Sequence, residues 1–393
     1  MAATTAFIQR VCLRNYKSIA ACEVCLRPLT FLVGPNGSGK SNFLDALLFA
    51  ADALRYSLDH ALRDRGGIQQ VRRRSGGHPN HFGMRLDFTL PGGAVGHYAF
   101  QIAARQSGGY EIQAEECELL VPGSPAPVAG YRVDRGLVRG LQAAPPPSAS
   151  NLYLAALADR EEFQPLYQAL TRIAVYRPDT AKIRDLQAPD AGGSLAGDAG
   201  NLASMLRRIT AQAPERKQRI EQYLARIVPG VCGVEVRSSG PREGLEFRQE
   251  MAGADHPWRF PATSMSDGAL HALGVLAALF QPRNAGTLVG IDGPVTGLDG
   301  LAASAMLDAL QEAATIAQVA ATTHSPPGLA DSSQQTQVWF QAVGGVTTIG
   351  IPALAGRLPS GESLLGLSQP RPEAEATARR DDEQLPLFDR EPL

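Results

Sequence analysis

The chain has 393 residues, of which 44% are hydrophobic and 19% are charged, with a formal net charge of −2 and a pI near 6.4. This is the composition of a globular protein of one or two domains, and it excludes a protein that coats nucleic acid through bulk positive charge. The sequence contains no apolar stretch close to the roughly 20 residues that a membrane helix requires. We therefore expect no membrane partner.

The cysteines and the N-terminus both indicate a cytoplasmic protein. Five cysteines in a long chain do not suggest a disulfide framework. Cys22 and Cys25 form a lone C-x-x-C, but an odd spacing on a strand points them to opposite faces, and the sequence offers no second ligand pair for a metal. Arg10, Arg14 and Lys17 interrupt the apolar residues that a secretory leader would need.

The first predicted elements surround a glycine-rich loop. Alternating residues predict strands over residues 7–13 and 23–26, and the apolar run 29–33 predicts a buried strand. The loop that follows, residues 34–41, fits the pattern G-x-x-x-x-G-K-[ST], and apolar residues then recur at helical spacing over 44–51. A strand, this loop and a helix in that order predict a phosphate-binding loop rather than a chance glycine turn.

The chemistry of such a loop indicates ATP, with Mg²⁺ as a second cofactor. Glycines let successive backbone N–H groups turn inward around phosphates, and the helix N-terminus adds a favourable dipole. Lys40 can reach the β- and γ-phosphates, while the Ser41 hydroxyl can ligate Mg²⁺. The residues predicted to bind nucleotide here are Asn36, Gly37, Ser38, Gly39, Lys40, Ser41 and Asn42.

The pattern then changes twice along the chain. Short β-like runs over residues 82–90, 97–103 and 110–120 are separated by glycine-containing turns, which predicts an antiparallel sheet. Arg72-Arg73-Arg74 is a compact basic cluster before them, and we interpret it as a solvated face rather than a phosphate track. Helical patterns follow around residues 151–173, 201–209 and 215–227, and short strand candidates follow at 234–237 and 245–249.

Three later segments could complete a nucleotide site. Ser266 and Gly268 begin a helical pattern, where a hydroxyl and free N–H groups can meet an anion. The apolar run 287–291 ends in Asp292, a carboxylate that can hold Mg²⁺. A strand-like run over 318–322 leads to His324, at the edge where open α/β sheets bind ligands. Each segment is ordinary alone, and their order makes the set specific.

In this order the motifs resemble the ABC-type ATPases of the RecF/SMC/OLD kind, also described as AAA family or predicted ATPases. The resemblance covers roughly residues 7–350, although the long heptad arrays of an extended coiled coil are absent. The segment Asn15-Tyr16-Lys17-Ser18 is similar to the N-terminal signature of that group. Likewise, Asp198-Ala199-Gly200-Asn201-Leu202 is similar to an internal signature.

The resemblance implies roles for individual residues. Asp292 falls at the Walker B acid, Leu298-Asp299 at the D-loop and His324 at the switch histidine, so Asp292 and His324 are the catalytic candidates and Ser41 and Asp292 the metal ligands. By analogy, Ser266 and Gly268 of one copy would reach the γ-phosphate held by another. This implies an ATP-dependent homodimer.

It also implies the fold class: an α/β P-loop NTPase, with an ABC-ATPase-like head, an antiparallel β-rich lobe and a helical insertion. We predict an N-terminal part of the head at residues 1–65, the β-rich lobe at 66–142 and a mainly helical insertion lobe at 143–262. The C-terminal part of the head would follow at 263–355, and a flexible tail at 356–393.

The family pattern breaks directly after the Walker B strand. The family usually reads I-E-E-P-E, whereas this chain reads I-D-G-P-V, so Asp292 keeps the first acid and Gly293 replaces the second. The second acid polarises the attacking water, and losing a positioned general base typically costs about 10²–10⁴-fold in rate. Either a slow ATPase uses His324 or another carboxylate, or the chain is a nucleotide switch with negligible turnover. Installing Glu at position 293 should raise turnover if the surrounding geometry is intact.

Two classes of biological role follow from the resemblance. The first is an ATP-dependent protein acting on DNA, in repair or phage defence; the alternative is a nucleotide-gated regulatory or scaffold protein that controls a separate effector, such as a nuclease. The ATPase subunit of a membrane transporter is disfavoured. Near the C-terminus, Gln384-Leu385-Pro386-Leu387-Phe388 matches the Q-L-x-L-F pattern that docks on the bacterial sliding clamp, although an apolar patch folding back on the chain is the simpler interpretation.

Overall fold

The computed structural model describes residues 7–75, 79–121, 129–141, 144–190, 193–283, 286–325 and 335–350. The predicted tail at 356–393, with its Gln384–Phe388 motif, lies outside these residues. Within them, no helix combines the length and the apolar character that crossing a bilayer would require.

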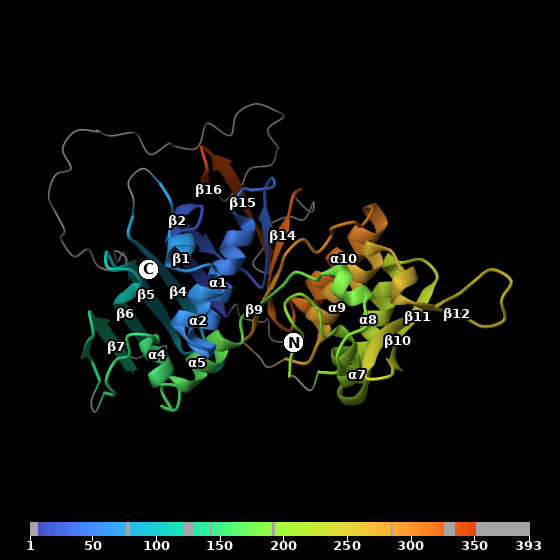
Figure 1. Ribbon diagram of the computed structural model, residues 1–393, viewed down its shortest axis with the longest axis horizontal. Coiled ribbons are helices and arrows are strands. Elements are labelled where there is room, and N and C mark those ends of the chain that lie inside the picture. The colour runs from blue at the N-terminus through green and yellow to red at the C-terminus, as the bar shows by residue number, and fades with distance from the viewer. Residues whose placement is uncertain are drawn as a thin grey trace.

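One long mixed sheet of 13 strands runs through the molecule (Figure 1). Its strand order is β8-β7-β6-β5-β4-β1-β2-β16-β15-β3-β14-β13-β9. The strands are β1 (Ile8–Tyr16), β2 (Ile19–Cys25), β3 (Leu29–Val33), β4 (His81–Thr89), β5 (Val95–Ala104), β6 (Tyr110–Leu120), β7 (Ala129–Asp134), β8 (Leu137–Arg139), β9 (Ala174–Tyr176), β13 (Leu288–Ile291), β14 (Gln318–Thr323), β15 (Gln335–Val343) and β16 (Val346–Gly350).

The five strands β15, β3, β14, β13 and β9 are parallel to one another and form the centre of the head. Every residue of β3, β13 and β14 is buried, as expected for parallel strands that are covered on both faces. Helix α1 (Lys40–Arg55) covers one face, while α9 (Asp267–Phe280) and α10 (Gly300–Ala313) pack on the other. Phe31 accordingly belongs to one core and its neighbour Leu32 to the other.

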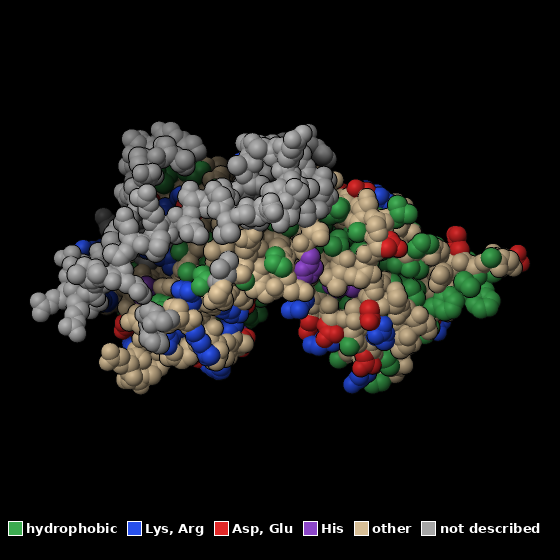
Figure 2. Space-filling view, turned by 90° about the horizontal axis from the view of Figure 1, so that it is seen from above, with side chains coloured by type: hydrophobic (Ala, Val, Ile, Leu, Met, Phe, Trp, Pro, Cys, Tyr) green, Lys and Arg blue, Asp and Glu red, His purple; other side chains and the backbone are tan. Residues whose placement is uncertain are grey.

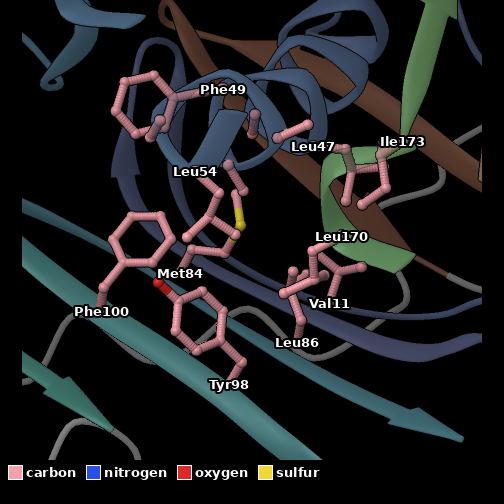
Figure 3. Close-up of a cluster of buried hydrophobic side chains, with 14 of the residues drawn as sticks. Val11, Leu47, Phe49, Leu54, Met84, Leu86, Tyr98, Phe100, Leu170 and Ile173 are labelled. Atoms are coloured by element: carbon pink, nitrogen blue, oxygen red, sulfur yellow. The ribbon is translucent and has the colours of Figure 1, made fainter. Parts of the chain in front are cut away.

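The antiparallel strands β4 to β8 continue this sheet rather than forming a separate one, because β4 pairs with β1 and places Met84 beside Leu13. Figure 3 shows the core beneath them, where Phe49 of α1 faces the side chains of β4 and β5. Phe49 meets Phe82 edge to face at 5.4 Å. Four short helices complete this side: α2 (Leu58–Arg63), α3 (Ile68–Val71), α4 (Tyr153–Ala156) and α5 (Gln164–Thr171).

Residues 143–262, which the sequence suggested as a mainly helical insertion lobe, contribute to both hydrophobic cores. Leu170 of α5 packs in the core that contains α1 and the strands β4 and β5, which we call the first lobe. Leu206 of α7 and Leu224 of α8 pack in the core that contains α9 and α10, which we call the second lobe. Strand β9, the edge strand of the main sheet, lies between α5 and α7 in the chain (Figure 1). The remaining helices of this stretch are α6 (Thr180–Arg184), α7 (Leu202–Gln212) and α8 (Pro214–Ile227).

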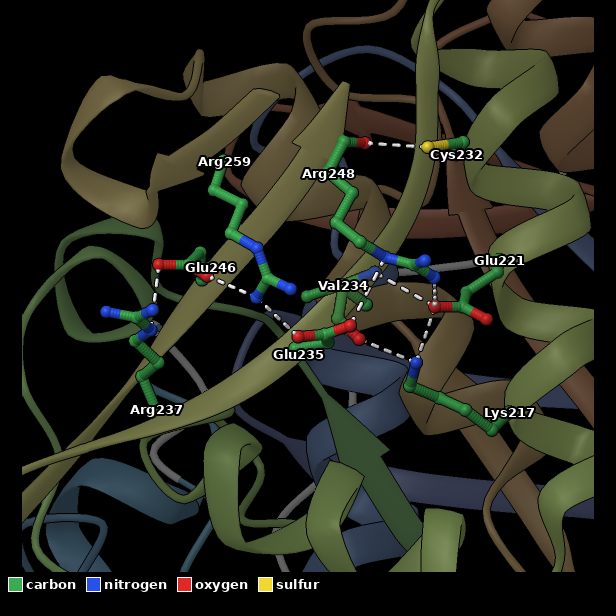
Figure 4. A network of polar contacts seen from close by, with 9 residues as sticks. All are labelled: Lys217, Glu221, Cys232, Val234, Glu235, Arg237, Glu246, Arg248 and Arg259. Carbon is green, nitrogen blue, oxygen red and sulfur yellow. Dashed lines mark hydrogen bonds and ion pairs between the residues drawn. The ribbon is translucent and has the colours of Figure 1, made fainter. Parts of the chain in front are cut away.

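A small antiparallel sheet of β10 (Val231–Ser239), β11 (Arg242–Gln249) and β12 (Trp258–Pro261) covers the second lobe. Its inner face contributes Val234 and Phe247 to the core. Its outer face carries an ion-pair network (Figure 4), in which Arg259 bridges Glu235 and Glu246, each at 2.9 Å. Hydrophobic side chains gather at the β12 end of the molecule in Figure 2, where Trp258 is 57% exposed.

Candidate nucleotide-binding site

The predicted site residues converge because four parallel strands end at one edge of the sheet. Pairing aligns Val33 of β3 with Thr323 of β14, and Ile291 of β13 with both Ala321 and Tyr176. The residues that follow these strands therefore meet at the carboxyl edge, which is where open α/β sheets bind ligands.

The glycines of the loop between β3 and α1 are required by its geometry. Gly34, Gly37 and Gly39 have φ angles of +157°, +75° and +100°, a region that favours glycine. A Cβ on Gly34 would lie 2.2 Å from the carbonyl oxygen of Phe340, and one on Gly39 would lie 2.2 Å from Oγ1 of Thr347. No side chain caps the first turn of α1, so its N–H groups are available to an anion, as a phosphate cradle requires.

Lys40 lies at the base of this loop with only 7% of its surface exposed. Its Nζ donates to the carbonyl oxygens of Gly34 at 2.7 Å and Pro35 at 2.8 Å. Burial lowers the pKa of Lys40, and the nearby Asp292 carboxylate opposes that shift. A buried ammonium beside free helix N–H groups fits the β- and γ-phosphates of a nucleotide.

The two predicted metal ligands are brought together across the sheet edge. Oδ1 of Asp292 accepts a hydrogen bond from the Ser41 hydroxyl at 3.2 Å and another from the Thr322 hydroxyl at 2.7 Å. The Thr322 hydroxyl in turn accepts from the backbone N–H of Gly293 at 2.8 Å. A carboxylate and a hydroxyl are oxygen donors of the kind that Mg²⁺ prefers, so these residues fit the ion.

A cavity of about 620 Å³ joins these groups, and we call it the P-loop cavity. The exposed His324 lines it, and so does Gly268, but Ser266 is not among its lining residues. Ser266 is exposed and caps α9, where its Oγ accepts from the N–H of Ala269 at 3.3 Å. The other predicted residues of the site, Asn36, Gly37, Ser38, Gly39, Lys40, Ser41, Asn42 and Asp292, all line the cavity.

At the position of the second acid, the backbone itself favours glycine. Gly293 has φ +69°, and a Cβ there would lie 2.6 Å from Oγ1 of Thr296. Among the described residues that line the P-loop cavity, the carboxylates are Asp292 and Asp267. Asp267 is held by Arg184 at 2.7 Å, which lowers its pKa. Asp292 thus fits the role of a metal ligand, whereas Asp267 is already paired with Arg184.

The two segments that resemble family signatures, residues 15–18 and 198–202, contact elements that line the P-loop cavity. The amide of Asn42, predicted to bind nucleotide, donates to the Ser18 hydroxyl at 2.8 Å, which ties α1 to the N-terminal signature. In the internal signature, the carbonyl of Asp198 accepts from the N–H of Asp179 at 2.9 Å, and its carboxylate pairs with Lys182 at 2.5 Å. These contacts fix the segment that leaves β9 towards the cavity.

Sequence reasoning missed Thr322 and Arg177, which both contact Asp292. Thr322 is the penultimate residue of β14, where its polar side chain on a buried strand was the available signal. Arg177 follows β9, whose three residues are too short to give a periodic signal.

Comparison with known protein families matches the two segments that contain the glycine-rich loop and Asp292. A family model described as "AAA domain, putative AbiEii toxin, Type IV TA system" matches residues 29–97 and 237–331. Among curated proteins, the sequence finds no match.

Solved structures resemble the whole head. An Smc head bound to the C-winged helix domain of ScpA has 16% sequence identity and a TM-score of 0.54, with 88% of this chain and 97% of that chain covered. An Smc head with an extended coiled coil, bound to the C-terminal domain of ScpA derived from Pyrococcus furiosus, has 14% identity and a TM-score of 0.51, with 88% and 96% covered. At this identity the likeness concerns the fold, and it confirms the predicted α/β head.

Proposed function

We propose, from the premise that this chain is an ABC/SMC-like P-loop ATPase, that it works as an ATP-dependent switch with slow turnover. One observation carries this proposal: the groups predicted to bind Mg²⁺ and triphosphate converge in the P-loop cavity, whereas Gly293 stands where the family has the water-polarising acid. Binding would then be retained, while the residue that would accelerate hydrolysis most is replaced.

The described residues divide the work of binding. The backbone of the loop and the Lys40 ammonium would hold the β- and γ-phosphates, and Ser41 and Asp292 would hold Mg²⁺, which supplies charge neutralisation. Thr322 keeps the Asp292 carboxylate in one orientation. With glycine at position 293, His324 is the group left to position the attacking water. Turnover would then be slow, because a missing general base typically costs about 10²–10⁴-fold in rate.

We further propose that ATP joins two copies of the chain. The exposed N-terminus of α9 with Ser266 supports this, since a serine-capped helix start can receive an anion presented by another molecule. Leu301, in the first turn of α10 directly after the D-loop segment, is 86% exposed. A second copy would cover this apolar side chain.

Measuring ATP affinity, phosphate release and molecular mass on one preparation tests the proposal. We expect Mg²⁺–ATP to convert monomers to dimers while phosphate release stays far slower than in ordinary ABC ATPases. Ser266→Arg should bind ATP as the unmodified chain does, yet remain monomeric. Steady-state phosphate release at the rate of ordinary ABC ATPases would contradict the switch.

For the biological role, we propose DNA repair or phage defence. The family model's description as a putative AbiEii toxin supports defence, and the motif resemblance supports a DNA-associated role. The basic cluster gives this less support, because Arg72 binds the carbonyl of Pro79 and Arg74 that of Gln69. DNA-stimulated ATP turnover would support this role.

A second candidate is a nucleotide-gated scaffold that controls a separate effector protein, such as a nuclease. Gly293 favours it, since a gate needs binding more than turnover, and the matched Smc heads are themselves bound to a partner protein. Co-purification of an effector, with turnover that DNA does not change, would favour this candidate. Docking on the sliding clamp through Gln384–Phe388 and a cytoplasmic location stay predictions.

A further inference from the structure

Arg177 emerges beside the proposed metal ligand because β9 and β13 run in parallel and in register. The pairing places Ile291 opposite Tyr176, and the N–H of Asp292 donates to the carbonyl of Tyr176 at 2.9 Å. The next residue of each strand therefore leaves the same edge of the sheet. Nη1 of Arg177 lies 3.9 Å from Oδ2 of Asp292.

The backbone of Arg177 is held by a hydrogen bond, whereas its side chain is exposed. Its N–H donates to the carbonyl of Gly197 at 2.7 Å, but its side chain is 80% exposed. An ion pair at 3.9 Å whose guanidinium is 80% exposed contributes little to folding. Stability therefore does not account for a guanidinium that lines the P-loop cavity.

The charges around the cavity indicate what this guanidinium can bind. Asp267 is paired with Arg184, and Asp292 lies near both Lys40 and Arg177. Among the described residues that line the cavity, Lys40 is buried, and Arg177 carries the exposed guanidinium that a polyanion could meet. Arginine also presents a planar fork of N–H donors, which matches two oxygens of one phosphate.

The position of Asp292 indicates which phosphate of a bound nucleotide Arg177 could reach. In P-loop NTPases the metal bridges the β- and γ-phosphates, so a group adjacent to the metal carboxylate can reach the terminal phosphate. Oδ1 of Asp292 accepts hydrogen bonds from the hydroxyls of Ser41 and Thr322, whereas Oδ2 is the oxygen that lies near Arg177. Arg177 therefore stands beside the carboxylate that would hold the metal.

We propose that Arg177 binds the terminal phosphate from within the same chain and makes the site distinguish ATP from ADP. This rests on the proposed function of the cavity as a nucleotide site. It deepens that function, because Arg177, in the segment after β9, would then detect whether ATP or ADP is bound, in addition to any second copy of the chain.

Calorimetric titration of the full chain with ATP and with ADP, both in Mg²⁺, tests the proposal. We expect Arg177→Ala to weaken ATP binding by about 10–100-fold and ADP binding by less than about threefold, because the lost charge-assisted hydrogen bonds involve only the terminal phosphate. Arg177→Lys should fall between, since it keeps the charge and loses the fork. Arg63→Ala, which breaks an exposed ion pair with Asp59 on α2, is the matched control and should bind both as the unmodified chain does.

The outcomes separate this inference from the proposal beneath it. Equal losses for ATP and ADP in Arg177→Ala, or no loss for either, would overturn the role of Arg177 while the nucleotide site stands. If the unmodified chain binds neither nucleotide, the proposed function fails and the inference fails with it.

Discussion

The hydroxyl of Ser41 and Oδ1 of Asp292 lie 3.2 Å apart, although 251 positions separate them in the sequence. Ser41 lies in the first turn of α1, directly after the loop that follows β3. Asp292 follows β13, which is separated from β3 in the sheet by β14 alone. This contact is the point at which the two halves of the head form one site. It places a hydroxyl and a carboxylate where Mg²⁺ would need them.

Thr322 should control how well this pair holds a metal. Thr322→Val removes the hydrogen bond to Asp292 and leaves the N–H of Gly293 without its acceptor. Loss of a group that orients a metal ligand typically costs about 10–100-fold in affinity, so we expect ATP binding to weaken by that factor in Mg²⁺. Thr322→Ser keeps the hydroxyl and should bind almost normally. Unchanged affinity in Thr322→Val, measured by calorimetry, would exclude this role.

Gly293→Glu should fail to restore fast hydrolysis, which revises the expectation from sequence. With φ +69°, and with Thr296 Oγ1 only 2.6 Å from the position that a Cβ would take, a side chain there is strained. We expect a loss of about 1–2 kcal/mol in stability from the left-handed backbone. Gly300→Glu is the matched control, since its Cβ would meet no atom within 4 Å at the start of α10. A tenfold rise in phosphate release by Gly293→Glu would contradict the structure.

Glu115 should be essential for the fold of the first lobe. It is fully buried, and Oε1 accepts from the hydroxyls of Tyr131 at 2.8 Å and Tyr98 at 3.1 Å and from the N–H of Leu154 at 2.8 Å. Glu115→Ala would leave these donors without an acceptor, at a cost of at least about 3 kcal/mol in the free energy of unfolding. Urea denaturation measures this, and a loss below about 1 kcal/mol would show that water replaces the carboxyl.

The same carboxyl should give the protein a pH-dependent stability. Burial raises the pKa of Glu115 above its ordinary value of 4.5, although its four hydrogen-bond donors act in the opposite direction. The folded state then keeps the proton to a higher pH than the unfolded state. Its contribution is complete below pH 4.5 and is lost as the pH rises through the folded pKa.

Glu115→Gln cannot titrate, so it isolates this effect. The stability of the unmodified chain relative to Glu115→Gln should be greatest below pH 4.5 and should decrease at higher pH. Denaturation curves at several pH values measure the difference. A difference that stays constant, or grows with pH, would show that the carboxyl is ionised in the fold.

The sequence predicted the elements whose pattern is local. Strands β3 and β6 have the bounds that the apolar runs gave, and the short candidates at 234–237 and 245–249 lie within β10 and β11. Strand β9 has three residues, and β15 mixes glutamines with Trp339 and Phe340, so neither gave a clear period. Their places depend on pairing with distant strands, which a single sequence does not contain.

The candidate site shows the same division. The pattern of the loop identified Lys40 and Ser41 because glycine spacing and a following helix define that geometry locally. The approach of Arg177 to Asp292 depends on the parallel register of β9 and β13. The strain at Gly293 also arose only in three dimensions, because the letter in the sequence shows a missing carboxylate and not the φ of the backbone.

The most direct test of a nucleotide site in the P-loop cavity is calorimetric titration of the full chain with ATP in Mg²⁺, beside Lys40→Ala. We predict saturable binding for the unmodified chain and none for Lys40→Ala, because the buried ammonium at the base of the loop is then lost. Equal thermal stability of the two proteins without nucleotide would show that the variant is folded. An unmodified chain that gives no heat with ATP, or a Lys40→Ala variant that binds it equally well, would contradict the site.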